Sequence, residues 1–111
     1  MKSTELKSKA LRSENGEYIF GFDDTGSHAC YMIYGLLKSK EKGRSVKPGK
    51  GHEEIILALE GDLEVTGYYS GTLEEGSAMH IEGEHECFLE NPAEHHAIYI
   101  IAGGHSDSGH H

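Results

Sequence analysis

The sequence predicts an all-β fold, a sandwich or a small barrel, on three observations. Short apolar stretches recur at roughly even spacing along the 111 residues, and turn-forming residues separate them. The chain combines 15 glycines with 36% hydrophobic residues, as in a turn-rich globular protein rather than a disordered one. No helix beyond the first dozen residues is convincing. A chain of this length has room for one core, so we expect a single domain over 1–104.

Seven strands are expected in order along the chain. They are Glu17–Phe22, Ala29–Lys38, Glu54–Leu59, Leu63–Tyr69, Ser77–Ile81, His85–Leu89 and His95–Ala102. The stretch 29–38 is apolar on both faces, which predicts a central strand. Residues 23–26 are typical of a turn, and the polar residues 39–50 are expected to form a loop. Residues 2–12 form either a frayed helix or an extended arm, and the sequence leaves both open.

Charge and length exclude several classes of partner. The net charge is −9, and all ten Lys and Arg residues lie at or before Lys50, whereas nucleic acid demands a basic face. No apolar run is long enough to span a bilayer, and residues 1–17 are too polar for a signal peptide. We therefore expect a cytoplasmic protein without a nucleic-acid or membrane partner. Cys30 and Cys87 are too few for a disulfide framework.

Two histidine-bearing segments carry the candidate functional residues. In the first, Pro48–Gly61, His52 and Glu54 are two residues apart. Because side chains alternate along a strand, both project from the same face of an extended strand. The second segment, Gly76–Asn91, follows about one hairpin later and contains His85. Together the two segments suggest a cation held in the mouth of a β-barrel.

These segments resemble the two motifs of the cupin superfamily, as they occur in small single-domain cupins of the RmlC-like type. Glu54, six intervening residues and Gly61 have the spacing with which the first cupin motif ends. Gly76, His85 and Asn91 resemble points of the second motif. The resemblance covers about half of the chain. It implies an antiparallel double-stranded β-helix, the cupin jelly-roll barrel, here with a short N-terminal arm, commonly dimeric and with a divalent cation in its mouth.

The resemblance is incomplete at the metal site. Cupins have a His-x-His pair three or four residues before the glutamate, whereas this chain has no histidine at positions 47–50. His52 is the obvious substitute. We therefore predict that His52, Glu54 and His85 hold a divalent cation and leave open positions for water or substrate. Two histidines and one carboxylate suit Fe or Mn and tolerate Zn or Ni.

The predicted function is a small metal-binding cupin that acts on a small molecule in the barrel mouth. The alternative is a cupin that binds or senses a small ligand without a metal and without catalysis. Enzyme status, substrate and metal identity stay open. A homodimer is expected, because cupins commonly dimerise and symmetric dimers are the commonest oligomers.

Two further features of the sequence leave alternatives open. Cys87 is either a buried apolar strand residue or, on the face of His85, a neighbour of the metal. Residues 105–111 form a His-rich tail with His105, His110 and His111. That tail either contributes to the mouth of the barrel or is the remnant of an affinity tag.

Overall fold

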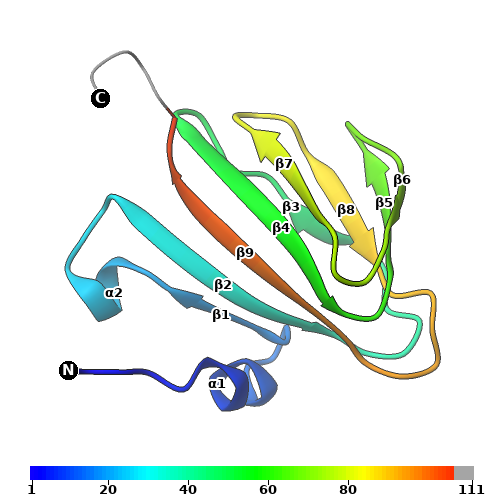
Figure 1. The fold of residues 1–111 in the computed structure, drawn as a ribbon, viewed down its shortest axis with the longest axis horizontal. Helices are drawn as coiled ribbons and strands as arrows, with labels where there is room; N and C mark the ends of the chain where they lie inside the picture. The colour runs from blue at the N-terminus through cyan, green and yellow to red at the C-terminus, as the bar shows by residue number, and fades with distance from the viewer. Residues whose placement is uncertain (107–111) are drawn as a thin grey trace.

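In the computed structural model, which describes residues 1–106, two antiparallel β-sheets face each other around one core (Figure 1). The elements in chain order are α1 (Leu6–Arg12), β1 (Glu17–Phe20), α2 (Phe22–Thr25), β2 (Cys30–Leu37), β3 (Arg44–Val46), β4 (His52–Glu60), β5 (Leu63–Gly67), β6 (Gly71–Leu73), β7 (Ala78–Glu82), β8 (Cys87–Glu90) and β9 (Ala97–His105). One sheet has the order β1-β2-β9-β4-β7, and the other β3-β8-β5-β6. The all-β prediction is confirmed. Within the described residues, no helix is both long enough and apolar enough to cross a membrane.

Three local expectations need correction. The expected loop at 39–50 contains the short strand β3, which pairs with β8. The expected turn at 23–26 is largely the one-turn helix α2, ended by Gly26 in the left-handed conformation. His105 is the last residue of β9 and not part of a tail, while His110 and His111 lie outside the described residues. Polar strands on sheet edges carry little periodic signal, which is why β3 escaped the sequence pattern.

The N-terminal residues form a helix rather than an extended arm. The Glu5 side chain accepts a hydrogen bond from the Ser8 backbone N–H at 3.0 Å, which caps the first turn of α1. Lys9 and Arg12 lie in the last turn, where positive charge suits the helix dipole. Ala10 is fully buried and anchors the helix on the sheet.

Alternation along β4 positions the residues on either side of the five-stranded sheet. Glu54, Ile56 and Ala58 are buried and face the second sheet, whereas Ile55 is 50% exposed on the outer face. β7 pairs with β4 in register, with Ile81 opposite Glu54. The inner side chains of both sheets form one apolar cluster, which also contains Cys87. Cys87 is therefore a core residue, and its thiol accepts a hydrogen bond from the Tyr69 backbone N–H.

The edges β1 and β3 are joined by an arginine. Arg44 of β3 donates a hydrogen bond to the Tyr99 hydroxyl at 2.6 Å and lies 3.8 Å from the Glu17 carboxylate of β1. It also bonds the Glu41 carboxylate at 3.0 Å and the backbone carbonyl of Asn15. The planar guanidinium binds several partners at once and so links the edge strands of the two sheets.

Candidate functional site

Glu54 lies inside the sandwich and is hydrogen-bonded to a tyrosine. Its side chain points inward from β4, and the residue is 6% exposed. The Tyr31 hydroxyl of β2 donates a hydrogen bond to this carboxylate. Burial raises the pKa of the Glu54 carboxyl above its ordinary value, and the Tyr31 hydrogen bond opposes that rise. Burial together with this bond also raises the pKa of Tyr31.

His52 lies at the beginning of β4, on the same face as Glu54, as the alternation predicted. Its Nδ1 lies 3.2 Å from the Lys50 carbonyl oxygen. The centre of its ring is 5.1 Å from that of His105, its partner across the β4–β9 ladder. His105 is therefore a strand residue beside the predicted site.

His85 lies in the connection between β7 and β8. Its ring stacks on the Tyr68 ring, with centroids 3.7 Å apart and planes 6° from parallel. Its Nδ1 is buried and has no hydrogen-bond partner in the described part of the chain. The ring is therefore held by an aromatic contact and not by a network that aims it at Glu54.

The cation that the cupin resemblance implies does not fit the described residues inside the sandwich. A divalent transition metal needs three or four ligand atoms converging on one point. The ligand atoms of His52, Glu54 and His85 do not all lie within 4.8 Å of one another, and the Glu54 carboxylate already accepts a hydrogen bond from the Tyr31 hydroxyl. This ligand set stays a prediction without geometric support.

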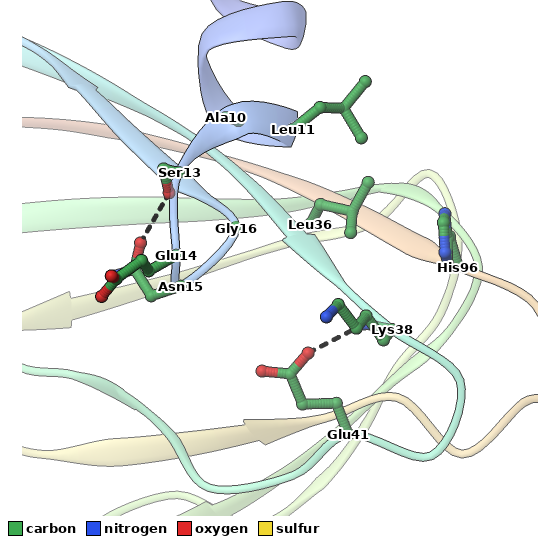
Figure 2. A pocket seen from close by; sticks show the side chains of 10 residues that line it. All are labelled: Ala10, Leu11, Ser13, Glu14, Asn15, Gly16, Leu36, Lys38, Glu41 and His96. Atoms are coloured by element: carbon green, nitrogen blue, oxygen red, sulfur yellow. Dashed lines mark hydrogen bonds between the residues drawn. The ribbon is translucent and has the colours of Figure 1, made fainter.

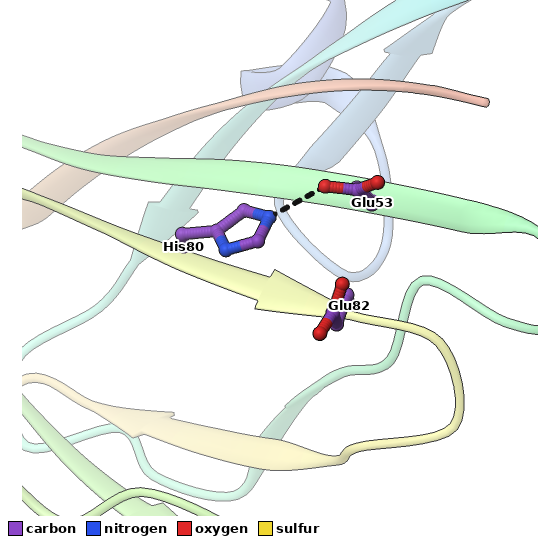
Figure 3. Close-up of side chains that lie close together, drawn as sticks. All are labelled: Glu53, His80 and Glu82. Carbon is purple, nitrogen blue, oxygen red and sulfur yellow. Dashed lines mark hydrogen bonds and ion pairs between the residues drawn. The ribbon is translucent and has the colours of Figure 1, made fainter. Parts of the chain in front are cut away.

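A different group of ligands converges on the outer face of the same sheet (Figure 3). The ligand atoms of Glu53, His80 and Glu82 all lie within 4.8 Å of one another, and among residues 1–106 this is the only group of three with that property. His80 Nε2 is 2.7 Å from Glu53 Oε1. Glu53 lies directly opposite Glu82 in the β4–β7 ladder, and His80 is two residues from Glu82 on the same face.

The sequence pattern missed this group because it depends on strand register. Met79 and Ile81 both point inward, which turns His80 outward. Glu53 precedes the expected metal ligand by one residue, and alternation places its side chain on the opposite face. Only the pairing of β4 with β7 shows that two acidic residues from distant segments meet.

A shallow hollow of about 350 Å³ adjoins the group. Glu53, Ile55 and His80 form one part of its lining, and Gly103, Gly104 and His105 of β9 form another. Gly103 and Gly104 are both half-buried, with the Tyr31 ring and the Ala29 carbonyl oxygen where their side chains would lie. The hollow gives a small molecule access to the Glu53–His80 pair.

A second hollow, of about 310 Å³, lies beneath α1 (Figure 2). Leu11 and Leu36 face each other across it, and His96 lies at one side. No group of three metal-ligating side chains lines this hollow within the described residues. We assign no chemistry to it.

Comparison with solved structures identifies the fold. A Cupin 2 conserved barrel domain protein from Salinispora arenicola superposes with a TM-score of 0.71 at 13% identity, over 96% of this chain and 90% of that one. An RmlC-like cupin from Shewanella frigidimarina gives 0.59 at 13% identity, over 74% and 71%. A recombinant oxalate oxidase in complex with glycolate gives 0.73 at 15% identity, over 93% and 59%.

The likeness lies in three dimensions and not in sequence. No protein-family model and no curated protein matches the sequence. The chain spans 53% to 60% of the length of several longer structures with the same fold, oxalate oxidase among them. At these identities the comparisons establish architecture alone. The chain therefore has the fold of these cupin structures.

Proposed function

We propose that this protein is a divalent-metal-binding cupin whose cation is held by Glu53, His80 and Glu82 on the outer face of the five-stranded sheet. The convergence of these three ligand atoms within 4.8 Å carries the proposal. Two carboxylates and one imidazole suit Mn, Fe, Zn or Ni ions. The remaining coordination positions face solvent.

The placement of the two carboxylates supports a cation. Glu53 and Glu82 are directly opposite each other on neighbouring antiparallel strands, an arrangement in which like charges destabilise the sheet. His80 contacts Glu53 but offsets this repulsion only when its ring is protonated. A divalent cation bound by both carboxylates would offset the repulsion directly.

The cation would act as a Lewis acid and a template for a small molecule in the adjoining hollow. Ile55 and the backbone of Gly103 and Gly104 line that hollow and would contact the molecule from the side. The oxalate oxidase structure contains glycolate, and we therefore propose a small carboxylate as the first ligand to test. Whether the bound molecule is transformed is a separate question from whether it binds.

A second candidate function is the binding of a small ligand without a metal. The hydrogen bond from Tyr31 to Glu54 favours it, because this bond engages the carboxylate that the cupin resemblance assigns to the cation. In this case the metal content of the purified protein is zero. The binding experiment below separates the two functions.

The test is isothermal titration of metal-stripped protein with Mn²⁺ and Zn²⁺. All variants carry His110→Ser and His111→Ser, so that the C-terminal histidines contribute nothing. We expect one cation per chain. Glu53→Gln, His80→Gln and Glu82→Gln should each weaken binding at least 10-fold. Glu60→Gln is the matched control, because Glu60 is an exposed carboxylate on β4 outside the group.

Two results would overturn the proposal. If Glu54→Gln and His85→Gln abolish binding while the outer variants bind normally, the cation lies at the site predicted from the sequence. If the parent protein binds neither cation at 1:1 stoichiometry, the metal-free ligand-binding function replaces it. Glycolate added to metal-loaded and metal-stripped protein then shows whether small-molecule binding requires the cation.

We also propose that the protein forms a homodimer through the outer face of the five-stranded sheet. Met32 of β2 is 40% exposed there and lies outside the hollow, whose lining includes Ile55 and Ala102. A second copy that covers the β1–β2 side of this face would bury Met32 and leave the hollow open to a small molecule.

A further inference from the structure

The two open edges of the sandwich differ in how they are closed. Arg44 joins the edge strands β1 and β3. Between the other two edge strands, β6 and β7, lies an apolar slot of about 160 Å³. Val65, Leu73 and Met79 line it, and Tyr69 and Ser70 lie at its rim. These side chains are on the far side of the β4–β7 ladder from the proposed metal ligands.

The slot exists because one position of β6 has no side chain. Gly71 pairs with Val65 in the β5–β6 ladder, so a side chain at 71 would project toward the same face as Val65. A Cβ built at Gly71 meets no atom within 4 Å. Val65 and Leu73 are almost fully buried beneath this space, and Met79 packs against the core from β7.

Contacts among the rings of Tyr69, Tyr68 and His85 order the rim of the slot. The Tyr69 backbone N–H donates to the Cys87 thiol at 3.4 Å, which fixes the start of the β5–β6 connection. The Tyr69 ring packs edge-to-face on Tyr68, with centroids 4.9 Å apart. Tyr68 in turn stacks on His85. A rim held in this way loses little conformational freedom when a ligand binds.

We propose that this slot binds a monocyclic aromatic molecule with a single hydroxyl group, a phenol. Its volume is close to that of a cavity of about 150 Å³ lined by apolar side chains, which accommodates benzene. The Met79 sulfur and the Tyr69 ring favour an aromatic over an aliphatic ring. The hydroxyls of Tyr69 and Ser70 have no hydrogen-bond partner among the described residues and are available to a polar substituent.

The methionines provide a direct readout. The chain has three, Met1, Met32 and Met79, and only Met79 lines the slot. In protein labelled with ¹³C at the methionine methyl groups, phenol should shift the Met79 signal saturably, with a dissociation constant on the order of 1 mM or tighter. The Met1 and Met32 signals should stay in place. Non-saturable shifts of all three would show nonspecific contact and overturn the proposal.

Variants and a second ligand test the chemistry. Val65→Ile adds one methylene to the slot and should weaken phenol binding at least 5-fold, as should Tyr69→Ala. Phe22→Ala is the control, since Phe22 is an exposed aromatic residue of α2 that stacks on His28 and lines no part of the slot. An unchanged Met32 signal verifies the fold of each variant. Cyclohexanol should bind at least 5-fold more weakly than phenol, and equal or tighter binding would exclude an aromatic site.

Discussion

The Tyr31 hydroxyl reaches the Glu54 carboxylate from two strands away, across a glycine. Tyr31 of β2 and Glu54 of β4 are both in register with Gly103 of β9, which lies between them. Because Gly103 has no side chain, the Tyr31 ring lies over its backbone and the hydroxyl meets the carboxylate beyond. The same arrangement recurs in mirrored order, because Tyr99 of β9 crosses Gly35 of β2 and its hydroxyl donates to Glu17 of β1.

A side chain at Gly103 should therefore destabilise the protein. A Cβ at this position overlaps the Tyr31 ring, and we expect Gly103→Ala to lower the free energy of unfolding by about 1–3 kcal/mol, as overpacking of a core does. Urea denaturation measures it. In a Tyr31→Ala background the same substitution should cost clearly less. Equal costs in both backgrounds would show that the ring is not what excludes the methyl group.

The buried Glu54 carboxyl predicts a pH dependence of stability. Its pKa is raised above the ordinary value of 4.5, chiefly by burial. Folding therefore favours the protonated form, so this contribution to stability is complete below about pH 4.5 and is lost as the pH rises through the raised pKa. Glu54→Gln stays neutral and keeps an acceptor for Tyr31. Its stability relative to the parent protein should be higher at pH 7 than at pH 4.

Thermal unfolding at the two pH values tests this. Glu74→Gln is the control, because Glu74 is exposed and its substitution should change stability equally at both. A relative stability of Glu54→Gln that is independent of pH, or that falls between pH 4 and pH 7, would contradict the raised pKa.

Arg44 should not be replaceable by lysine. Its guanidinium bonds the Tyr99 hydroxyl and the Glu41 carboxylate at once, and its side chain is only 10% exposed. A lysine ammonium cannot reproduce the planar fork, so we expect Arg44→Lys to cost about 2 kcal/mol of unfolding free energy. Lys47→Ala, which removes the exposed pair with Glu84 at 3.9 Å, should cost less than about 0.5 kcal/mol. Similar losses for the two variants would refute the special role of Arg44.

The fold could be predicted well from the sequence because buried and exposed side chains alternate along the strands of a sandwich. The stretch 29–38 was correctly identified as a central strand, and β2 lies between β1 and β9. Three elements were missed for physical reasons. β3 and β6 each have three residues with one buried side chain, too few for a periodic signal. α2 is a single turn whose Asp24 side chain accepts from the Gly21 backbone N–H, a capping contact in a segment that otherwise resembles a turn.

The candidate site was less predictable than the fold. Spacing correctly placed His52 and Glu54 on one face, but a spacing carries no information about what lies across the ladder. The Tyr31 hydroxyl that meets Glu54 comes from a strand 23 residues earlier, and the pairing of Glu53 with Glu82 depends on register. Such contacts between distant segments are set by sheet topology, which a local motif does not encode.

A negative charge introduced on the outer face of the five-stranded sheet should prevent dimerisation. Met32 is 40% exposed there and lies outside the hollow beside the proposed metal ligands, so Met32→Glu should convert the proposed dimer to a monomer without weakening Mn²⁺ binding. Ile19→Glu is the matched control: Ile19 is 57% exposed, but on edge strand β1 its side chain points to the opposite face from that of Met32. Light scattering after size-exclusion chromatography gives the mass of each. A monomeric parent protein would refute the proposed dimer. A Met32→Glu variant that remains dimeric would place the interface elsewhere, because a buried unpaired carboxylate is not tolerated in an apolar interface.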